Sequence, residues 1–342
     1  MKKVVALVLT LMLSLGMFSG AFAVNEDVEG EIVIASSMYQ FVLDEMAELL
    51  KKEFPNLNVE FYYKGTTDLI SQLSGEMGPD HTGLLSVDML LVAEPAYSLE
   101  LKDYGYLHKF DVSVKDQLAF PYDPDGYWYP VRVCNMVLAY NPEKVSAEEL
   151  PKTFKEFAEN PAMKGVISMG NPLTSGTAFA AVSALTEKYG MEYLDALRAN
   201  NVMIESGSTA LGKLESGECK EIMILEESVL KKRKEEGSKL AVIYPEDGNI
   251  MIPSTAMIVA EEKSKNANTA ACEAIADWLF SEAGQTAIVN GYMHSVIKGF
   301  GKLPYDSVST EQLISSDMGV NWENAYHNRN TLVDEWNKRV NN

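Results

Sequence analysis

A strand, a polar turn and a helix follow one another three times within residues 31–104. The strands are predicted at residues 31–35, 58–63 and 87–92, and each precedes a stretch with apolar residues at helical spacing. This order is typical of βαβ units, whose parallel strands form a sheet covered by helices. Ligands of such sheets lie beyond the carboxyl ends of the strands, so we expect the polar turns to share one edge. These turns hold Ser36, Ser37, Thr66, Thr67 and Glu94.

Two long apolar segments predict strands that pass between two lobes. Residues 127–142 form the first, after an Asp-, Pro- and Gly-rich stretch at 110–126 that predicts a surface loop. Residues 250–259 form the second, and another run of strands and helices lies between the two segments. We therefore expect an α/β fold with two lobes. The first lobe is predicted to comprise residues 24–131 and 250–300, and the second residues 132–249 and 301–342.

The turn at residues 171–177 follows a short strand and opens a helix. Ser175, Gly176 and Thr177 stand at the helix start, where Ser and Thr are preferred caps and Gly permits close approach of a bound group. Unpaired N–H groups and the positive end of the helix dipole suit an anion there. An ordinary capped helix that binds nothing has the same pattern, so the turn predicts an anion site only together with the similar turns of the first lobe.

Charged residues near the other strand ends extend this candidate site. Arg132 is the only basic residue in its long strand and could hold a phosphate or carboxylate with two hydrogen bonds, unless it pairs with a nearby acid. Glu226, Glu227 and Glu246 follow two further strands and could accept hydrogen bonds from hydroxyls or pair with an amine. The alternative for these three is solvated loop charge. Trp128 and Tyr129 are either a pocket wall or ordinary packing.

The N-terminus predicts export. Residues 1–23 contain Lys2 and Lys3, an apolar run, and an A-x-A cleavage site at Ala21–Ala23, which together indicate a signal peptide. This segment is too short for a membrane span, and no later apolar run is long enough. Because no cysteine stands at the cleavage point, we expect a protein without a lipid anchor there, located in the periplasm.

Composition narrows the function classes. The net charge of −20 disfavours nucleic acid and anionic membranes as partners. Cys134, Cys219 and Cys272 are widely spaced, so they predict buried thiols, with one pair possible, and neither a disulfide framework nor a metal site. The four histidines show no metal-ligand spacing, and no G-x-S-x-G elbow or P-loop is present. We expect no metal, no cofactor and no enzyme activity; an exported hydrolase using Glu226 and Glu246 is the alternative from another class.

Taken together, these motifs resemble the solute-binding proteins of ABC importers, of the ferric-ion-binding type that includes organophosphate and phosphonate binders. The resemblance implies a type II periplasmic binding protein fold, with two mostly parallel sheets flanked by helices and a ligand cleft between the lobes. It also implies a membrane permease as partner, and we expect a monomer. The motifs that carry the resemblance are Glu31–Ser37, Asp88–Tyr97, Tyr129–Arg132, Tyr140–Pro142, Asn171–Thr177, Gly217–Glu218, Tyr244–Gly248, Trp278–Ser281 and Gly284–Gln285.

One departure from that family bears on the solute. Iron-binding members carry two adjacent tyrosines after the strand that here ends at Leu225, whereas this chain has Glu226, Glu227 and Ser228. Phenolates are well suited to ferric ion, so their loss favours a small anionic solute of the phosphorylated-sugar or phosphonate type. Ferric iron held by carboxylates and a synergistic anion is the alternative. The predicted ligand-binding residues are Ser36, Ser37, Thr66, Thr67, Glu94, Arg132, Ser175, Gly176, Thr177, Glu226, Glu227 and Glu246.

Overall fold

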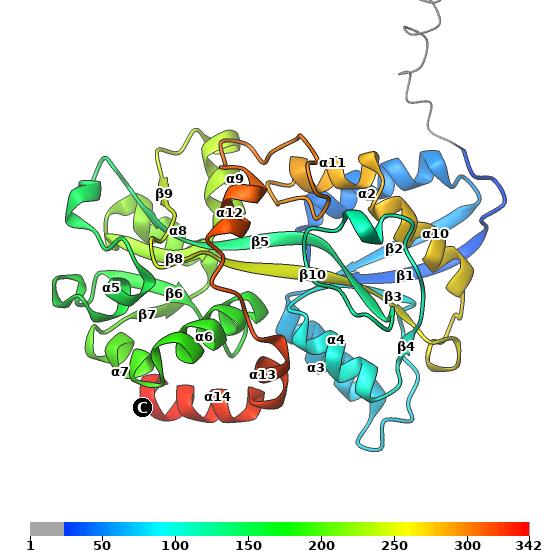
Figure 1. Cartoon of the computed structure of the whole chain (residues 1–342), viewed down its shortest axis with the longest axis horizontal. Coiled ribbons are helices and arrows are strands. Elements are labelled where there is room, and N and C mark those ends of the chain that lie inside the picture. The colour runs from blue at the N-terminus through cyan, green and yellow to red at the C-terminus, as the bar shows by residue number, and fades with distance from the viewer. Residues whose placement is uncertain (1–23, 342) are drawn as a thin grey trace, which may run out of the picture.

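The computed structural model describes residues 24–341, so the predicted signal peptide and Asn342 lie outside the described residues. Figure 1 shows two α/β bodies side by side, with two long strands running through the centre from one body to the other. These strands are β5 (Trp128–Tyr140) and β10 (Ile250–Val259), and nearly every residue of both is buried. A strand covered on both faces lacks polar alternation, which is why both were recognisable as continuous apolar runs.

The first body is built on three parallel strands. β1 (Gly30–Ser36) pairs with β2 (Leu57–Tyr63) on one side and with β3 (Met89–Ala93) on the other. β3 then pairs antiparallel with the second half of β10. The other elements of this body are β4 (Leu107–His108), α2 (Gln40–Glu53), α3 (Thr66–Met77), α4 (Ala96–Asp103), α10 (Thr269–Leu279) and α11 (Glu282–Asn290).

The second body repeats this plan. β6 (Ile167–Gly170) pairs in parallel with β7 (Met203–Glu205) and with β8 (Glu221–Leu225). β8 pairs antiparallel with the second half of β5. The other elements of this body are β9 (Ala241–Ile243), α5 (Phe154–Glu159), α6 (Gly176–Tyr189), α7 (Glu192–Ala199), α8 (Gly207–Ser216) and α9 (Glu226–Glu236).

The two parallel sets belong to one hydrogen-bonded sheet. Among residues 24–341, ten strands form this sheet: eight follow the order β2-β1-β3-β10-β5-β8-β6-β7, while β4 pairs with β10 and β9 pairs with β5. β10 and β5 pair antiparallel from Ile250–Met136 to Met257–Trp128, with a register shift between Ser254 and Thr255. The two-lobed α/β architecture is confirmed, and the ladder between the crossing strands joins the two expected sheets into one.

The C-terminal segment contacts both bodies. α12 (Thr310–Ser315) is followed by α13 (Trp322–His327), which packs against α4 of the first body. α14 (Arg329–Trp336) continues into residues 337–341, which pack against α7 of the second body. In Figure 1 α13 and α14 lie below the centre of the molecule, and the chain ends beside α7. The lobe boundaries given by the sequence stay a prediction, because this segment belongs to neither body by its contacts alone.

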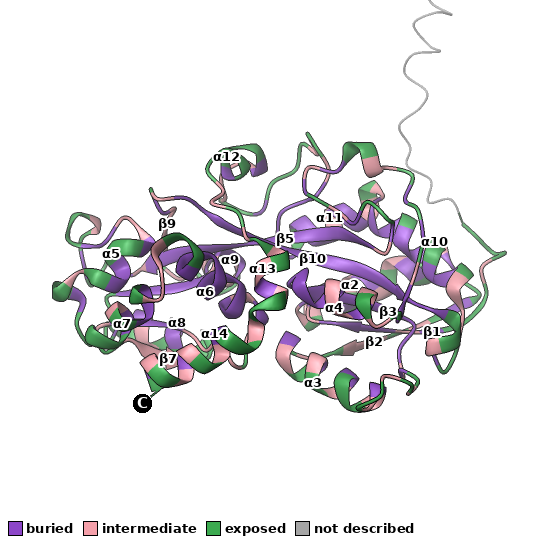
Figure 2. Ribbon diagram, turned by 60° about the horizontal axis from the view of Figure 1, so that its bottom comes forward, coloured by how far each residue is buried: buried purple, intermediate pink, exposed green. Residues whose placement is uncertain are grey.

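Buried residues follow the sheet, and exposed residues lie on the outer faces of the helices (Figure 2). None of the described helices is long and apolar enough to cross a bilayer. Cys134, Cys219 and Cys272 are buried and unpaired, in agreement with the predicted buried thiols.

The stretch at residues 110–126 is not a simple surface loop. Phe110, Val112, Leu118 and Phe120 are all buried. The Phe110 ring lies 5.0 Å from the ring of Tyr129, which is itself buried. The stretch is an irregular, partly exposed loop as predicted, but its apolar side chains belong to the hydrophobic core, so the prediction of a surface loop is right only in part.

Candidate ligand-binding site

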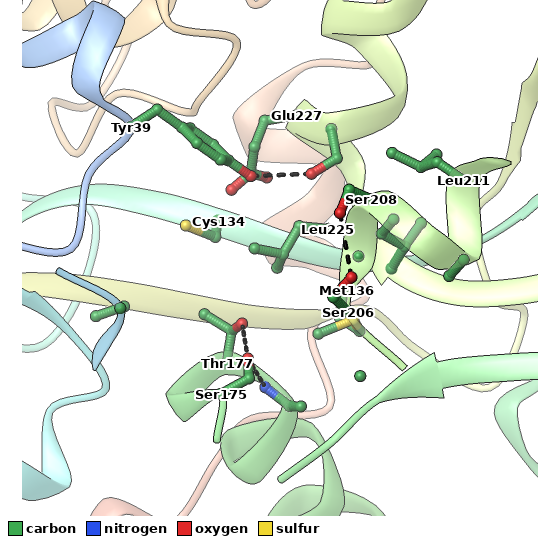
Figure 3. Close-up of a pocket in the computed structure, with 18 of the residues that line it drawn as sticks. Tyr39, Cys134, Met136, Ser175, Thr177, Ser206, Ser208, Leu211, Leu225 and Glu227 are labelled. Carbon is green, nitrogen blue, oxygen red and sulfur yellow. Dashed lines mark hydrogen bonds between the residues drawn. The ribbon is translucent and has the colours of Figure 1, made fainter. Parts of the chain in front are cut away.

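A cavity of about 800 Å³ lies between the two bodies, and both line it. Figure 3 shows Tyr39 of the first body pointing toward Glu227 of the second, with Ser175 and Thr177 of the second body lower in the view. β5 contributes Arg132, Cys134 and Met136 to the lining. Trp128 and Tyr129 lie elsewhere, buried in the packed interior, so they do not wall this cavity.

The first turns of three helices meet at the cavity. Its lining includes Thr66 at the start of α3, Gly176 at the start of α6 and Gly207 at the start of α8. Ser175 caps α6, because its Oγ accepts from the backbone N–H of Ala178 at 3.3 Å. Ser206 caps α8 in the same way. The amide groups left over and the positive ends of three helix dipoles favour an anion here.

Gly176 and Thr66 bring the two bodies into contact at the cavity. A Cβ added at Gly176 would lie 2.6 Å from Cγ2 and 2.9 Å from Cβ of Thr66, closer than van der Waals contact allows. The absence of a side chain at 176 therefore lets the starts of α6 and α3 approach each other. A solute held at both helix starts would be enclosed by both bodies.

Gly176→Ala is expected to weaken solute binding roughly ten-fold or more. The added Cβ would push the starts of α6 and α3 apart, and such overpacking costs about 1–3 kcal/mol. Titration calorimetry measures the affinity, and X-ray scattering measures ligand-driven compaction. Gly212→Ala in α8 is the control, since an added Cβ there meets nothing within 4 Å. Equal affinity and compaction in both variants would show that the ligand-bound form keeps the two helix starts apart.

Arg132 is buried at the cavity without a carboxylate partner. Its side chain is 2% exposed, and its Nη1 contacts Sγ of Cys134 at 3.2 Å while its Nη2 donates to the carbonyl of Ser37 at 3.4 Å. Its Nε has no hydrogen-bond partner, and none of the ion pairs among residues 24–341 includes this guanidinium. A buried, unpaired cation is costly in a folded protein, so this position favours an anionic occupant.

Glu227 lies in the same cavity and is also buried. Burial raises the pKa of Glu227, although the nearby Arg132 charge and the Cys134 thiol oppose this. Its Oε1 has no hydrogen-bond partner. The next residue, Ser228, bonds across the cavity to the Tyr39 hydroxyl at 2.9 Å (Figure 3). The lining therefore holds one buried basic group, Arg132, and one buried acidic group, Glu227, and each has an atom without a hydrogen-bond partner among the described residues.

Glu226 does not line the cavity; it is buried at the centre of a polar network. Because α9 begins at Glu226, this side chain and that of Glu227 leave the helix in different directions. The Glu226 carboxylate accepts hydrogen bonds from Asn135 at 3.2 Å, Tyr244 at 2.5 Å, His294 at 3.2 Å and Ser307 at 2.5 Å. The structure therefore places Glu226 in this network, and the sequence-based expectations of a ligand contact or a solvated loop charge do not describe it.

Three further predicted residues lie outside the cavity lining. Ser36 is used in its own turn, because its Oγ donates to the Leu91 carbonyl at 3.1 Å and accepts from the N–H of Met38 at 3.0 Å. Thr67 is half-buried in the first turn of α3 without lining the cavity. Glu246 is exposed, and its N–H donates to the carbonyl of Lys152 at 2.8 Å. The structure thus brings together Ser37, Thr66, Arg132, Ser175, Gly176, Thr177 and Glu227.

Glu94 is fully buried and forms an ion pair with Arg329 of α14 instead of lining the cavity. Its φ of +88° is rarely adopted by residues other than glycine. The Arg329 guanidinium also lies 4.3 Å from the ring centroid of Phe179 in α6. Arg329 thereby links a turn of the first body to a helix of the second. Burial raises the pKa of Glu94 to about 7, even though the Arg329 charge opposes this rise.

Arg329→Met is expected to lower the free energy of unfolding by about 2 kcal/mol at pH 8 and by less at pH 5. A raised pKa means that the folded state favours protonated Glu94. The free energy of unfolding therefore falls as the pH rises from the ordinary carboxyl pKa of 4.5 toward the folded-state pKa of about 7. Without Arg329 this fall continues above pH 7, because the buried carboxylate then has no cation. Urea unfolding at both pH values tests this, with exposed Lys338→Met as control. An equal loss at both pH values would assign the effect of Arg329 to packing on Phe179.

Sequence reasoning missed much of the apolar part of the lining. Met136, Met169 and Met223 line the cavity, as do Tyr39 and Tyr63 of the first body. The start of α8, at Gly207, also lines the cavity and was not among the predicted ligand-binding residues. Methionines in strands are ordinary core residues, so only the three-dimensional arrangement distinguishes these from packing.

A two-lobed α/β chain whose helix starts face an interlobe cavity defines the class of periplasmic binding proteins, here of type II. The sequence model of the bacterial extracellular solute-binding proteins matches residues 86–308, so the chain belongs to this family. Membership of this family agrees with the solute-binding class that the sequence motifs predicted. No curated protein matches the chain significantly in sequence.

Solved structures with the same fold bind different solutes. Iron-bound HitA from Pseudomonas aeruginosa is 20% identical, with a TM-score of 0.76 and coverage of 89% of this chain and 99% of its own. AfuA from Actinobacillus pleuropneumoniae, with fructose-6-phosphate bound, is 17% identical, with a TM-score of 0.76 and coverage of 92% and 99%. A periplasmic thiamin binding protein is 17% identical, with a TM-score of 0.71 and coverage of 94% and 99%. At these identities the similarity concerns the fold, and the solute must be argued from the residues of this chain.

Proposed function

We propose that this protein captures a small organic solute carrying a phosphate or phosphonate group and delivers it to the permease of an ABC importer. The observation that carries the proposal is the buried Arg132, which has no carboxylate partner and lies at the same cavity as three helix starts. An oxyanion would satisfy the guanidinium and the free amide groups together. We also propose that the protein acts as a monomer in the periplasm and that it performs no chemistry on the solute.

The cavity suits a ligand larger than an inorganic ion. Its volume of about 800 Å³ lies in the range of pockets for organic ligands. Closure follows from contacts to both bodies, because a ligand shifts the equilibrium toward the form in which it makes more contacts. Ferric iron is the rival cargo. Of the two adjacent carboxylates considered for it, Glu226 already accepts four hydrogen bonds away from the cavity, and Glu227 lines the cavity.

A thermal-shift screen of the exported chain tests the proposal. Phosphate monoesters and alkylphosphonates are expected to raise the melting temperature, because a ligand of the folded state stabilises it by mass action. Ferric citrate, citrate alone and neutral sugars are the comparison set. A shift with ferric citrate that citrate alone does not reproduce, together with no shift from any phosphate ester or phosphonate, would overturn the proposal in favour of iron transport.

A further inference from the structure

Sulfur-containing side chains line one wall of the cavity. Cys134 and Met136 on β5, Met223 on β8 and Met169 on β6 all belong to its lining. These strands are neighbours in the order β5-β8-β6. Met223 is paired with Met169 on one side and with Leu138 on the other, and residues paired across strands share a face of the sheet. Cys134, Met136 and Leu138 are two residues apart along β5, and residues at this spacing lie on the same face of a strand. The four sulfur-containing side chains therefore belong to one face of the sheet.

Aromatic side chains of the first body line the same cavity. Tyr63 stands at the end of β2 and is 44% exposed, an unusual exposure for so large a side chain in a concave site. Tyr39 stacks on Phe41, with ring centroids 5.8 Å apart, and its hydroxyl is bonded to Ser228. Tyr39 is therefore fixed by its neighbours, whereas Tyr63 presents aromatic surface that no other ring covers among the described residues.

Many of the polar side chains in the lining already have partners. Ser175 and Ser206 are engaged as helix caps, and Ser228 is bonded to Tyr39. The buried side-chain atoms of the lining that lack a partner are Nε of Arg132 and Oε1 of Glu227. The strands β5, β8 and β6 contribute mainly apolar side chains to the lining, so this wall offers few partners for a solute body with many hydroxyl groups. In Figure 3 Leu225 lies between Cys134 and Met136, while Met136 and Leu211 lie farther from Tyr39.

We infer that the solute carries a flat aromatic or heteroaromatic ring in addition to its anionic group, and that the thioether wall and Tyr63 contact this ring. The inference rests on the proposed function for the anionic group. Thioether sulfur makes favourable contacts with aromatic rings, and tyrosine pairs with a ring by stacking or edge contact. A ring is also apolar enough for a wall of methionine and leucine, which a sugar is not.

Three phosphate monoesters that differ only in their organic part test the inference by titration calorimetry. Phenyl phosphate is expected to bind roughly ten-fold or more tighter than methyl phosphate and glucose 1-phosphate, because it buries a ring's apolar area. If glucose 1-phosphate binds as tightly as phenyl phosphate, the inference fails while the proposed function stands. If none of the three binds, and phosphonates also give no thermal shift, the proposed function fails with it.

Variants of Tyr63 locate the ring. Tyr63→Ala is expected to reduce the preference for phenyl over methyl phosphate about five-fold, whereas Tyr63→Phe keeps it. Tyr305→Ala is the matched control, because Tyr305 is 40% exposed and lies outside the cavity lining. Met223→Thr is expected to reduce the same preference from the opposite wall. An unchanged preference for phenyl phosphate in both Tyr63→Ala and folded Met223→Thr would overturn the inference. It would also be overturned if Ag⁺ raised the melting temperature of the wild type but not of Met223→Leu, since the wall would then be a soft-metal site.

Discussion

Arg132→Met is expected to weaken binding of a phosphate ester by about 100- to 1,000-fold, equivalent to about 3–4 kcal/mol. The guanidinium is 2% exposed and forms no direct ion pair with a carboxylate among residues 24–341, so a bound oxyanion would supply a directly bonded counter-charge in addition to the nearby Glu227. Charge interactions are stronger in such a water-poor site than in solution. Calorimetric titration with the ester that gives the largest thermal shift measures the loss.

The stability of this variant separates a binding role from a structural one. Methionine has a similar length and needs no hydrogen bonds, so Arg132→Met is expected to fold and to unfold at an equal or higher urea concentration in the absence of ligand. Arg132→Lys keeps the charge but loses the planar fork, so its affinity is expected to lie between those of the wild type and the methionine variant. Unchanged affinity in folded Arg132→Met would show that the helix starts alone hold the anion.

The fold was predictable because its signals are local. The crossing strand predicted at 250–259 was found with the same bounds, and the one predicted at 127–142 was found at Trp128–Tyr140. Continuous apolar runs mark strands that helices cover on both faces, and Ser or Thr before a helical pattern marks its start. The cap of α6 at Ser175 is of this kind, which is why the stretch 175–177 was expected at the cavity and lies there.

The parts of the site that could not be predicted depend on partners distant in sequence. Glu94 was expected at the cavity as a polar residue after a strand, yet it pairs with Arg329, 235 residues away. Glu226 and Glu227 are adjacent and identical in type, and only the direction of the first turn of α9 sends one into a network and the other to the cavity. The methionine wall requires the strand order β5-β8-β6, which no local pattern contains.

Glu226→Ala is expected to lower the free energy of unfolding at pH 7 by about 3–5 kcal/mol, because it removes a buried charged acceptor and leaves its donors unsatisfied. These donors come from β5, from the residue after β9, and from two sites beyond α11. Urea unfolding followed by circular dichroism measures the loss. Glu48→Ala, at an exposed position of α2, is the control and is expected to change stability by less than about 0.5 kcal/mol.

The pH dependence of this loss distinguishes the charge of Glu226 from its packing. Burial alone would raise the pKa of Glu226, but hydrogen bonds from His294, Ser307 and Tyr244 together hold it below the ordinary value of 4.5. A lowered pKa means that the ionised group stabilises the folded state above 4.5, and that this contribution is lost as the pH falls through the folded-state pKa. The difference between wild type and Glu226→Ala is therefore expected to shrink on acidification below 4.5. A difference that stays constant with pH would assign the effect to the lost side-chain volume, and the network would then hold the crossing strands without any contribution from charge.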